Sequence, residues 1–278
     1  MKRILVNELK RAFVNRIMLL VIVMETLLVI VYTVQEVLPV YYVSNPFRYS
    51  VIETGKVRGI LGTYYTWIGF NFSQCQTIMF TILPLIAALP YGSSLYYDEK
   101  KRYVENILIR CRRKDYYIAK TIAIFVTGGV VATYPLVLSL IINAAYLPFE
   151  RIVPELSWFT VKGVSVLAEL FYKAPIVYVI IYILVTFVSF GILNCLCIPA
   201  SYIFANGFVI MAVPFTVYYG SFVVCSFLGK KSASLWLSMR FSYLLKNDAL
   251  IVICTFVVII VLISISLVAR IRRHSDIL

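Results

Sequence analysis

The sequence predicts an all-α polytopic membrane protein with six transmembrane helices, and three observations carry this prediction. Hydrophobic residues make up 62% of the 278 residues. Charged residues make up 14%, against about 25% in a soluble domain. Apolar runs of about twenty residues recur between polar stretches, which is the length a helix needs to cross a bilayer. We therefore expect one transmembrane domain over residues 1–278.

The net charge fits a chain that lies in a membrane. The 26 Lys and Arg against 13 Asp and Glu give a formal net charge of +13. In a soluble protein this excess would suggest nucleic acid as a partner. Here the retention of basic residues on the cytoplasmic side and their attraction to anionic lipid explain much of it. We expect membrane lipid as a partner and no nucleic acid.

The N-terminal stretch, KRILVNELKRAFVN, predicts an amphipathic helix over residues 1–16. Its basic residues surround an apolar face that consists of Ile4, Leu5, Leu9, Ala12 and Phe13. A helix of this kind lies in the plane of the membrane interface, and we expect it on the cytoplasmic surface.

The first span is expected over residues 17–38. The run is too long for a signal peptide and no A-x-A site follows it. Glu25 lies roughly 12 Å along this helix from Ile17, at about 1.5 Å per residue. An ionised carboxylate at that depth is costly. Glu25 is therefore either a contact for substrate or protons, or a structural carboxyl that is hydrogen-bonded to a neighbouring helix.

The second span is expected over residues 67–91, after a glycine-containing loop at 39–66. Trp67 opens it as an interfacial anchor, and Pro84 and Pro90 are expected to kink it. The third span, 118–146, contains Gly128-Gly129, which permits close helix approach.

The fourth and fifth spans, 173–198 and 204–228, form a hairpin with an uncharged return that begins at Pro199. Outer loops are expected at 147–172 and 229–246, and the sixth span at 248–269. Six spans place both termini on one side. The N-terminal stretch, the segment from Lys100 to Lys120 and the C-terminal tail hold 16 of the 26 Lys and Arg. This excess predicts that all three lie in the cytoplasm, at the plasma membrane.

The segment 92–117 between the second and third spans is the most basic polar break in the chain. Its apolar stripe has helical spacing and consists of Tyr103, Val104, Ile107, Leu108 and Cys111. Arg110, Arg112 and Arg113 fall mainly on the other faces. The segment is expected to dock on lipid, on its own bundle or on a partner protein.

Enzyme motifs are missing from the sequence. It has no G-x-x-x-x-G-K-[ST] for ATP and no G-x-S-x-G, and a single histidine, His274, excludes H-E-x-x-H. No two acids lie at i and i+3 or i+4 within a span. We therefore expect a chain that is not an enzyme and holds no metal or cofactor.

The order of these parts resembles an ABC-2 type permease, the membrane subunit of an ATP-binding cassette exporter. The likeness in layout covers the whole chain and is sharpest from Leu83 to Lys120, which begins LPLIAALPYG. The family pattern continues here as Asp98-Glu99, Tyr103, Ile107-Leu108, Arg110, Arg113, Tyr117 and Ala119-Lys120. The family commonly has glycine just before the aromatic residue. This chain has Arg102 there, which leaves the form of that turn open.

The resemblance implies that two permease subunits, in a homodimer or a heterodimer, form a pathway for an amphipathic or hydrophobic peptide, lipid or drug. A dimer of cytosolic ATPases, holding ATP and Mg, would bind beneath them. Segment 92–117, the coupling segment, would supply a cytoplasmic coupling helix. The implied interface is Glu99, Tyr103, Val104, Ile107, Leu108, Arg110, Cys111, Arg112 and Arg113.

Three other functions remain open. A secondary transporter or channel would use Glu25. A permease-like immunity or sensor subunit would share this layout without pumping. A membrane-embedded enzyme acting on lipid would need a cluster of polar groups at one depth, which the sequence does not show.

Overall fold

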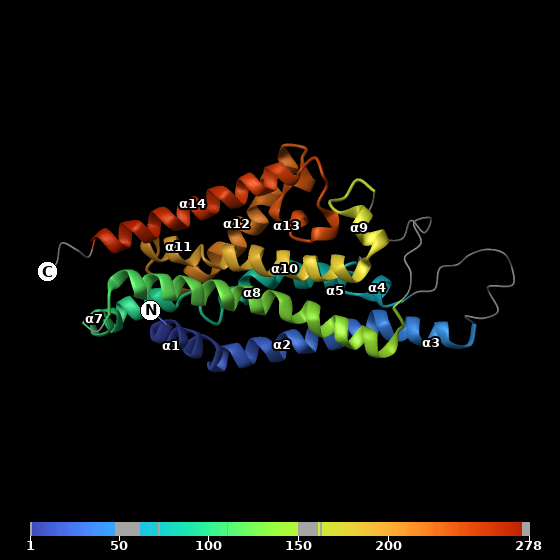
Figure 1. Ribbon diagram of the computed structural model, residues 1–278, viewed down its shortest axis with the longest axis horizontal. Helices are drawn as coiled ribbons and strands as arrows, with labels where there is room; N and C mark the ends of the chain where they lie inside the picture. Colours follow the sequence, from blue (N-terminus) through green and yellow to red (C-terminus); the bar gives the residue numbers. More distant parts are fainter. Residues whose placement is uncertain are drawn as a thin grey trace.

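The computed structural model describes residues 2–47, 62–71, 73–109, 111–149, 161 and 163–273. Over these residues the chain is helical and contains no β-strand. A single isolated bridge pairs Ser165 with Leu245. The long helices lie side by side in an elongated bundle (Figure 1). The all-α prediction is confirmed for the described part of the chain.

Two names identify the ends of the bundle. The α7 end, at the left in Figure 1, holds α1 (Lys2–Phe13), α6 (Ser94–Lys100), α7 (Tyr103–Leu108) and the last turn of α14 (Ala249–Arg273). The α4 end, at the right, holds α3 (Leu38–Phe47), α4 (Thr63–Thr66) and α9 (Ala168–Lys173). The other helices are α2 (Arg16–Tyr32), α5 (Gln74–Ala88), α8 (Arg113–Tyr146), α10 (Pro175–Asn194), α11 (Cys197–Ile203), α12 (Gly207–Phe227) and α13 (Leu235–Ser238).

Five helical segments are long and apolar enough to cross a membrane. They are Arg16–Tyr42, Arg113–Tyr146, Pro175–Ile203, Gly207–Phe227 and Ala249–Arg272. These segments support a multi-pass membrane protein and match five of the six predicted spans. The first continues from α2 through a π-helical turn, Thr33–Val37, into α3.

The predicted second span differs most from the structure. Its helix, α5, has 15 residues and is about 22 Å long, which is short of a hydrocarbon core of about 30 Å. Residues 67–70 before it form a turn. Trp67 is completely buried and donates a hydrogen bond from Nε1 to the Leu136 carbonyl at 3.0 Å. The prediction of Trp67 as an interfacial anchor is wrong. The non-helical backbone here is buried within protein, which a membrane permits.

The helices α8 and α10 form the closely packed centre of the bundle (Figure 1). A Cβ atom on Gly128 would lie 2.5 Å from the Cβ of Asn194, and one on Gly191 would lie 2.7 Å from Phe125 Cε2. Both distances are too short for any side chain, so the helices approach this closely only because these residues are glycine. The close approach predicted at Gly128-Gly129 is confirmed.

Two boundaries are corrected. The helix α8 begins at Arg113, so the end of the coupling segment belongs to a 34-residue helix. The predicted return from Pro199 to Asn206 is shorter in the structure. Pro199 lies in the first turn of α11, where proline is tolerated. The chain reverses at residues 204–206, where the Asn206 side chain caps α12.

The predicted outer loop at 229–246 is not a solvated loop. It contains α13 and two 3-10 turns, Lys231–Ala233 and Phe241–Tyr243. Leu235, Met239 and Arg240 in this segment are at most 3% exposed. Ser242 donates a hydrogen bond to the Gly69 carbonyl at 3.5 Å, so the segment packs against the residues that precede α5.

Candidate functional site

A buried lysine organises the α7 end of the bundle. Lys120, near the start of α8, is 1% exposed. Its Nζ lies 2.5 Å from Asp98 Oδ2 on α6 and 3.0 Å from Glu8 Oε2 on α1. It also lies 3.0 Å from the Tyr91 hydroxyl oxygen. A buried ammonium group is stable only when it is paired and hydrogen-bonded, and Lys120 meets both conditions.

A second cation completes the cluster. Arg11 on α1 donates to Asp98 Oδ1 from Nη2 at 2.8 Å and to Glu8 Oε1 from Nη1 at 3.1 Å. Burial alone would raise the pKa of Asp98. The hydrogen bond from Arg11 and the charge of Lys120 outweigh this effect, so the pKa lies below its usual value of 3.8. Two cations therefore balance two carboxylates.

Two tyrosines donate further hydrogen bonds to the carboxylate oxygens that Lys120 contacts. Tyr116 on α8 donates a hydrogen bond to Asp98 Oδ2 at 3.1 Å, and Tyr91 donates one to Glu8. We call the whole set the Lys120 cluster, and it consists of Glu8, Arg11, Tyr91, Asp98, Tyr116 and Lys120. It joins α1, the turn before α6, α6 itself and α8.

The N-terminal helix is amphipathic, as predicted, but it packs against the bundle. Its predicted apolar residues Ile4, Leu9 and Phe13 are partly buried against the main core. Glu8 and Arg11 lie one turn apart and place the polar part of this inner face over Lys120. This helix is therefore held by charge as well as by apolar contact.

A second ion pair lies on the opposite side of α6. Glu99 pairs with Arg270 on α14. Arg270 is 3% exposed and donates a hydrogen bond to Ser201 Oγ at 2.7 Å. The guanidinium carbon also lies 3.8 Å from the centre of the Tyr202 ring. The consecutive acids Asp98 and Glu99 thus connect α6 to two different groups of helices.

The apolar stripe of the coupling segment docks on its own bundle. Val104 is 5% exposed and belongs to the main core. Ile107, Leu108 and Cys111 are partly buried against that core. Of the three surfaces left open by the sequence, the structure brings these stripe residues against the bundle itself.

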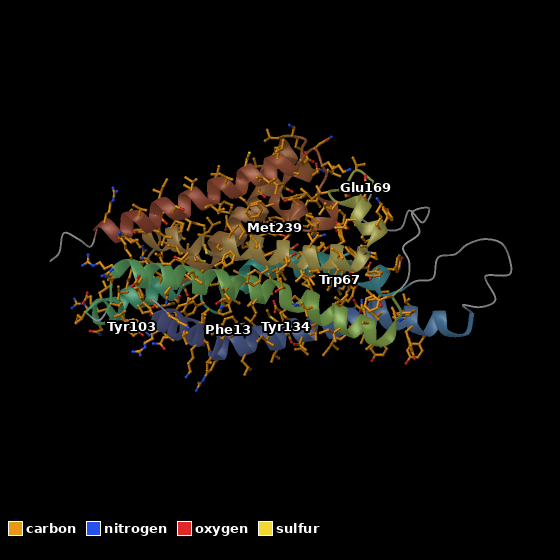
Figure 2. The ribbon with its side chains drawn as sticks, viewed as in Figure 1. Phe13, Trp67, Tyr103, Tyr134, Glu169 and Met239 are labelled. Carbon is orange, nitrogen blue, oxygen red and sulfur yellow. The ribbon has the colours of Figure 1, made fainter. Side chains whose placement is uncertain are left out.

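Tyr103, the remaining member of the stripe, and the basic residues of the same segment are more accessible. Tyr103 is 37% exposed, and its ring lies 4.4 Å from the guanidinium carbon of Arg11. Figure 2 shows Tyr103 near one end of the bundle and Trp67 toward the other. Arg112 is exposed and Arg113 is half-buried. Arg110 lies outside the described residues.

The turn before α7 is left-handed at Arg102. Arg102 has φ 54° and ψ 19°, in the left-handed region. Glycine adopts this conformation without strain, whereas other residues rarely do. The backbone between α6 and α7 is therefore strained at this residue.

A pocket of about 550 Å³ opens beside the Lys120 cluster. It lies between the end of α1, the turn that precedes α6, and α7. Its polar lining includes Arg11, Asn15, Ser93, Ser94, Lys101, Tyr103 and Asn106. The Ser94 hydroxyl is buried without a hydrogen-bond partner. The pocket is thus able to receive a polar side chain or a small polar group.

Glu25 does not make the hydrogen bond to a neighbouring helix that a structural role predicts. The residue is 1% exposed on α2, and neither carboxylate oxygen has a hydrogen-bond partner among the described residues. The hydrogen bond to a neighbouring helix comes instead from Thr26, whose hydroxyl lies 2.8 Å from that of Tyr134. Glu25 and the coupling segment are separate sites.

Sequence reasoning overlooked most of the Lys120 cluster. It assigned Lys120 to the charge that sets topology, although this lysine falls two residues inside the predicted third span. That position was the available signal, because a lysine within an apolar run needs a buried partner. Glu8 and Arg11 gave no such signal, since both fit an ordinary interfacial helix.

Comparison with protein-family models, with curated proteins and with solved structures finds no match for the chain.

Proposed function

We propose that this chain is the membrane-spanning permease subunit of an ATP-binding cassette exporter. One observation carries the proposal. The coupling segment contains the short helices α6 and α7, and two consecutive acids of α6 pair with different helices: Asp98 with α1 and α8, and Glu99 with α14. A force applied to α6 and α7 would therefore reach both groups of helices through these ion pairs.

The proposal includes a topology. Six crossings place α1, the coupling segment and the end of α14 in the cytoplasm, and the plasma membrane is the expected location. In this topology α5 completes the second crossing together with the buried turn at Trp67. A second permease subunit, identical or paired, supplies the other half of the pathway. The substrate class is an amphipathic or hydrophobic peptide, lipid or drug.

The ATPase partner meets a different surface from the one the sequence suggested. Because Val104 and its neighbours pack inward, the proposed contact uses the outer side of the segment. The exposed residues there are Lys100, Lys101, Arg102, Tyr103, Glu105, Asn106, Ile109 and Arg112. This surface is mainly basic, so an acidic groove on the ATPase would orient it. ATP and Mg would be held by that partner.

Co-purification with a measured activity tests the proposal. We expect the chain, isolated from its source organism in mild detergent, to carry a nucleotide-binding subunit and to show ATPase activity. Replacing Lys101 and Arg112 together by Glu should abolish both. The matched control replaces Lys230 and Lys231 by Glu, because both lie in the segment before α13 and are exposed. Equal loss in the control, or transport by the chain alone without ATP, would refute the proposal.

Glu25 supports a second candidate, a secondary transporter or channel. A buried carboxyl with no partner among the described residues is able to exchange a proton or a cation during transport. In this case a proton or ion gradient would drive substrate into proteoliposomes that contain the chain alone. Glu25→Gln would then abolish uptake, whereas the permease proposal predicts no gradient-driven uptake by either protein.

A further inference from the structure

Arg240 is a buried cation without an anionic partner among the residues that the structure describes. It lies between α13 and the Phe241–Tyr243 turn and is 1% exposed. Its one hydrogen bond runs from Nη2 to the Thr77 carbonyl on α5, at 3.5 Å. Its Nε–H has no partner. A guanidinium group carries five N–H donors, so most of its hydrogen-bonding capacity is unused.

The groups that face Arg240 carry no negative charge. Trp236 and Phe80 place their rings 4.4 Å and 5.5 Å from the guanidinium carbon. The titratable groups around it are the phenols of Tyr182 on α10, Tyr218 on α12 and Tyr243. No carboxylate among the described residues pairs with it. Neither ring offers an oxygen acceptor to the N–H donors of the guanidinium group.

Other buried polar groups without a partner among the described residues lie on α5 and α10, two helices that contact the Arg240 segment. Gln76, next to Thr77 on α5, is completely buried, and neither amide atom has a partner. The hydroxyls of Tyr178 and Tyr182 on α10 are also buried and unpaired. Both of these rings pack against Phe241, which follows Arg240. Buried polar groups are rarely left unpaired in such numbers without a missing partner.

We propose that Arg240 and Gln76 bind one oxyanion, a carboxylate or phosphate group, toward the α4 end of the bundle. The edge of the guanidinium group matches two oxygens of such an anion. The Gln76 amide and the phenol hydroxyls supply further donors. The anion neutralises Arg240 as Asp98 and Glu8 neutralise Lys120. The site stands whether or not the chain is an exporter subunit.

The oxyanion has two sources, a small ion in solution or the head group of an anionic lipid. Both offer phosphate oxygens to the same donors. Inorganic phosphate tests the first source. Phosphatidylglycerol tests the second, and phosphatidylcholine, which is zwitterionic, is its control.

Thermal unfolding of the full chain in neutral detergent measures binding, because a ligand that binds only the folded state raises the unfolding temperature. We expect phosphate or phosphatidylglycerol to raise this temperature saturably, at constant ionic strength. Arg240→Met should need at least tenfold more of the same probe for half the effect. Lys231→Met, an exposed lysine in the same segment, should behave like the wild type.

Each outcome decides the proposal. A response to phosphate assigns the site to a small anion, and a response to phosphatidylglycerol alone assigns it to lipid. If neither probe acts, or if Arg240→Met responds as the wild type does, the proposal is wrong. If Arg240→Met does not fold, Gln76→Leu keeps the cation and should still weaken the response at least threefold. An unchanged response in that variant would also overturn the proposal.

Discussion

Lys120 and Arg240 are both 1% exposed, but they differ in their partners. Lys120 is paired with carboxylates, whereas no carboxylate among the described residues pairs with Arg240. At the α7 end, Lys120 lies within 3.0 Å of two carboxylates that come from two different helices. Toward the α4 end, Arg240 meets aromatic rings, phenols and one carbonyl. The first cation is compensated by its own chain, so it fixes helices in place. No described residue compensates the second, so we infer that it is available to an anion from outside.

The two buried cations, Lys120 and Arg240, also differ in what they imply for stability and for function. A compensated buried pair is expensive to break, because removal of one partner leaves the other charge buried and unpaired. An uncompensated cation is expensive to keep. Its presence in a folded chain therefore suggests a role in binding, whereas the Lys120 cluster needs no role beyond holding α1, α6 and α8 together.

The largest expected effect is the difference between two Met substitutions. Lys120→Met leaves Glu8 and Asp98 with a single cation and should lower the free energy of unfolding by ~3–5 kcal/mol. Arg240→Met, measured without added anion, should leave it unchanged or raise it. Titration with urea, which is uncharged, in neutral detergent measures both values.

Lys114→Met is the control for the first of these variants, because Lys114 is exposed on the same helix and its loss should cost less than ~0.5 kcal/mol. The comparison breaks down if Lys120→Met and Arg240→Met are destabilised equally.

The pH dependence of unfolding sharpens the comparison at the α7 end. The pKa of Asp98 is lowered in the folded state, so its stabilising contribution is fully present above its usual pKa of 3.8. That contribution is lost as the pH falls below this value, through the folded pKa. The wild type should lose stability as the pH falls below 3.8, whereas Asp98→Asn should show a smaller loss over the same pH steps. Thermal unfolding at stepped pH measures both, and identical slopes would exclude Asp98 as the titrating group.

A smaller effect is expected from the ion pair on the other side of α6. Glu99 is about one-third exposed, so solvent weakens its pairing, and Glu99→Gln should cost only ~1 kcal/mol. The stronger consequence rests on the proposed function. In the complex with the ATPase, Glu99→Gln should reduce transport per ATP hydrolysed while leaving assembly intact. A variant that transports with normal coupling would show that α6 does not transmit force through Arg270.

Much of the bundle follows from apolar run length. The apolar runs predicted the bounds of α8, α10, α12 and α14 to within several residues. Gly128-Gly129 predicted the close packing of α8. Run length failed at residues 67–91, because an apolar run does not show whether its residues face lipid or other protein. Trp67 is buried by α8 and α10, so its segment does not need to be a continuous helix.

The candidate sites could be predicted less well, because each depends on residues that are distant in the sequence. Glu8, Asp98 and Lys120 meet only after α1 folds back along α8. The local sequence predicts that Arg240 lies in an outer loop, because no nearby residue indicates that the chain from 229 to 246 packs back into the bundle. Pairing and burial of charge are tertiary properties, whereas hydropathy is local.

The smallest expected effect concerns the strained turn next to the Lys120 cluster. Arg102 adopts a left-handed conformation, which costs an L-residue roughly 1–2 kcal/mol. Arg102→Gly removes this strain but loses more backbone entropy on folding, so a net gain of up to ~1 kcal/mol is expected. Arg102→Ala removes the same exposed side chain and keeps the strain, which makes it the matched control. Glycine should raise the unfolding temperature above that of alanine. If the two variants have the same unfolding temperature, the turn relaxes at no cost. The ion pairs of α6 then do not force residue 102 into the left-handed conformation.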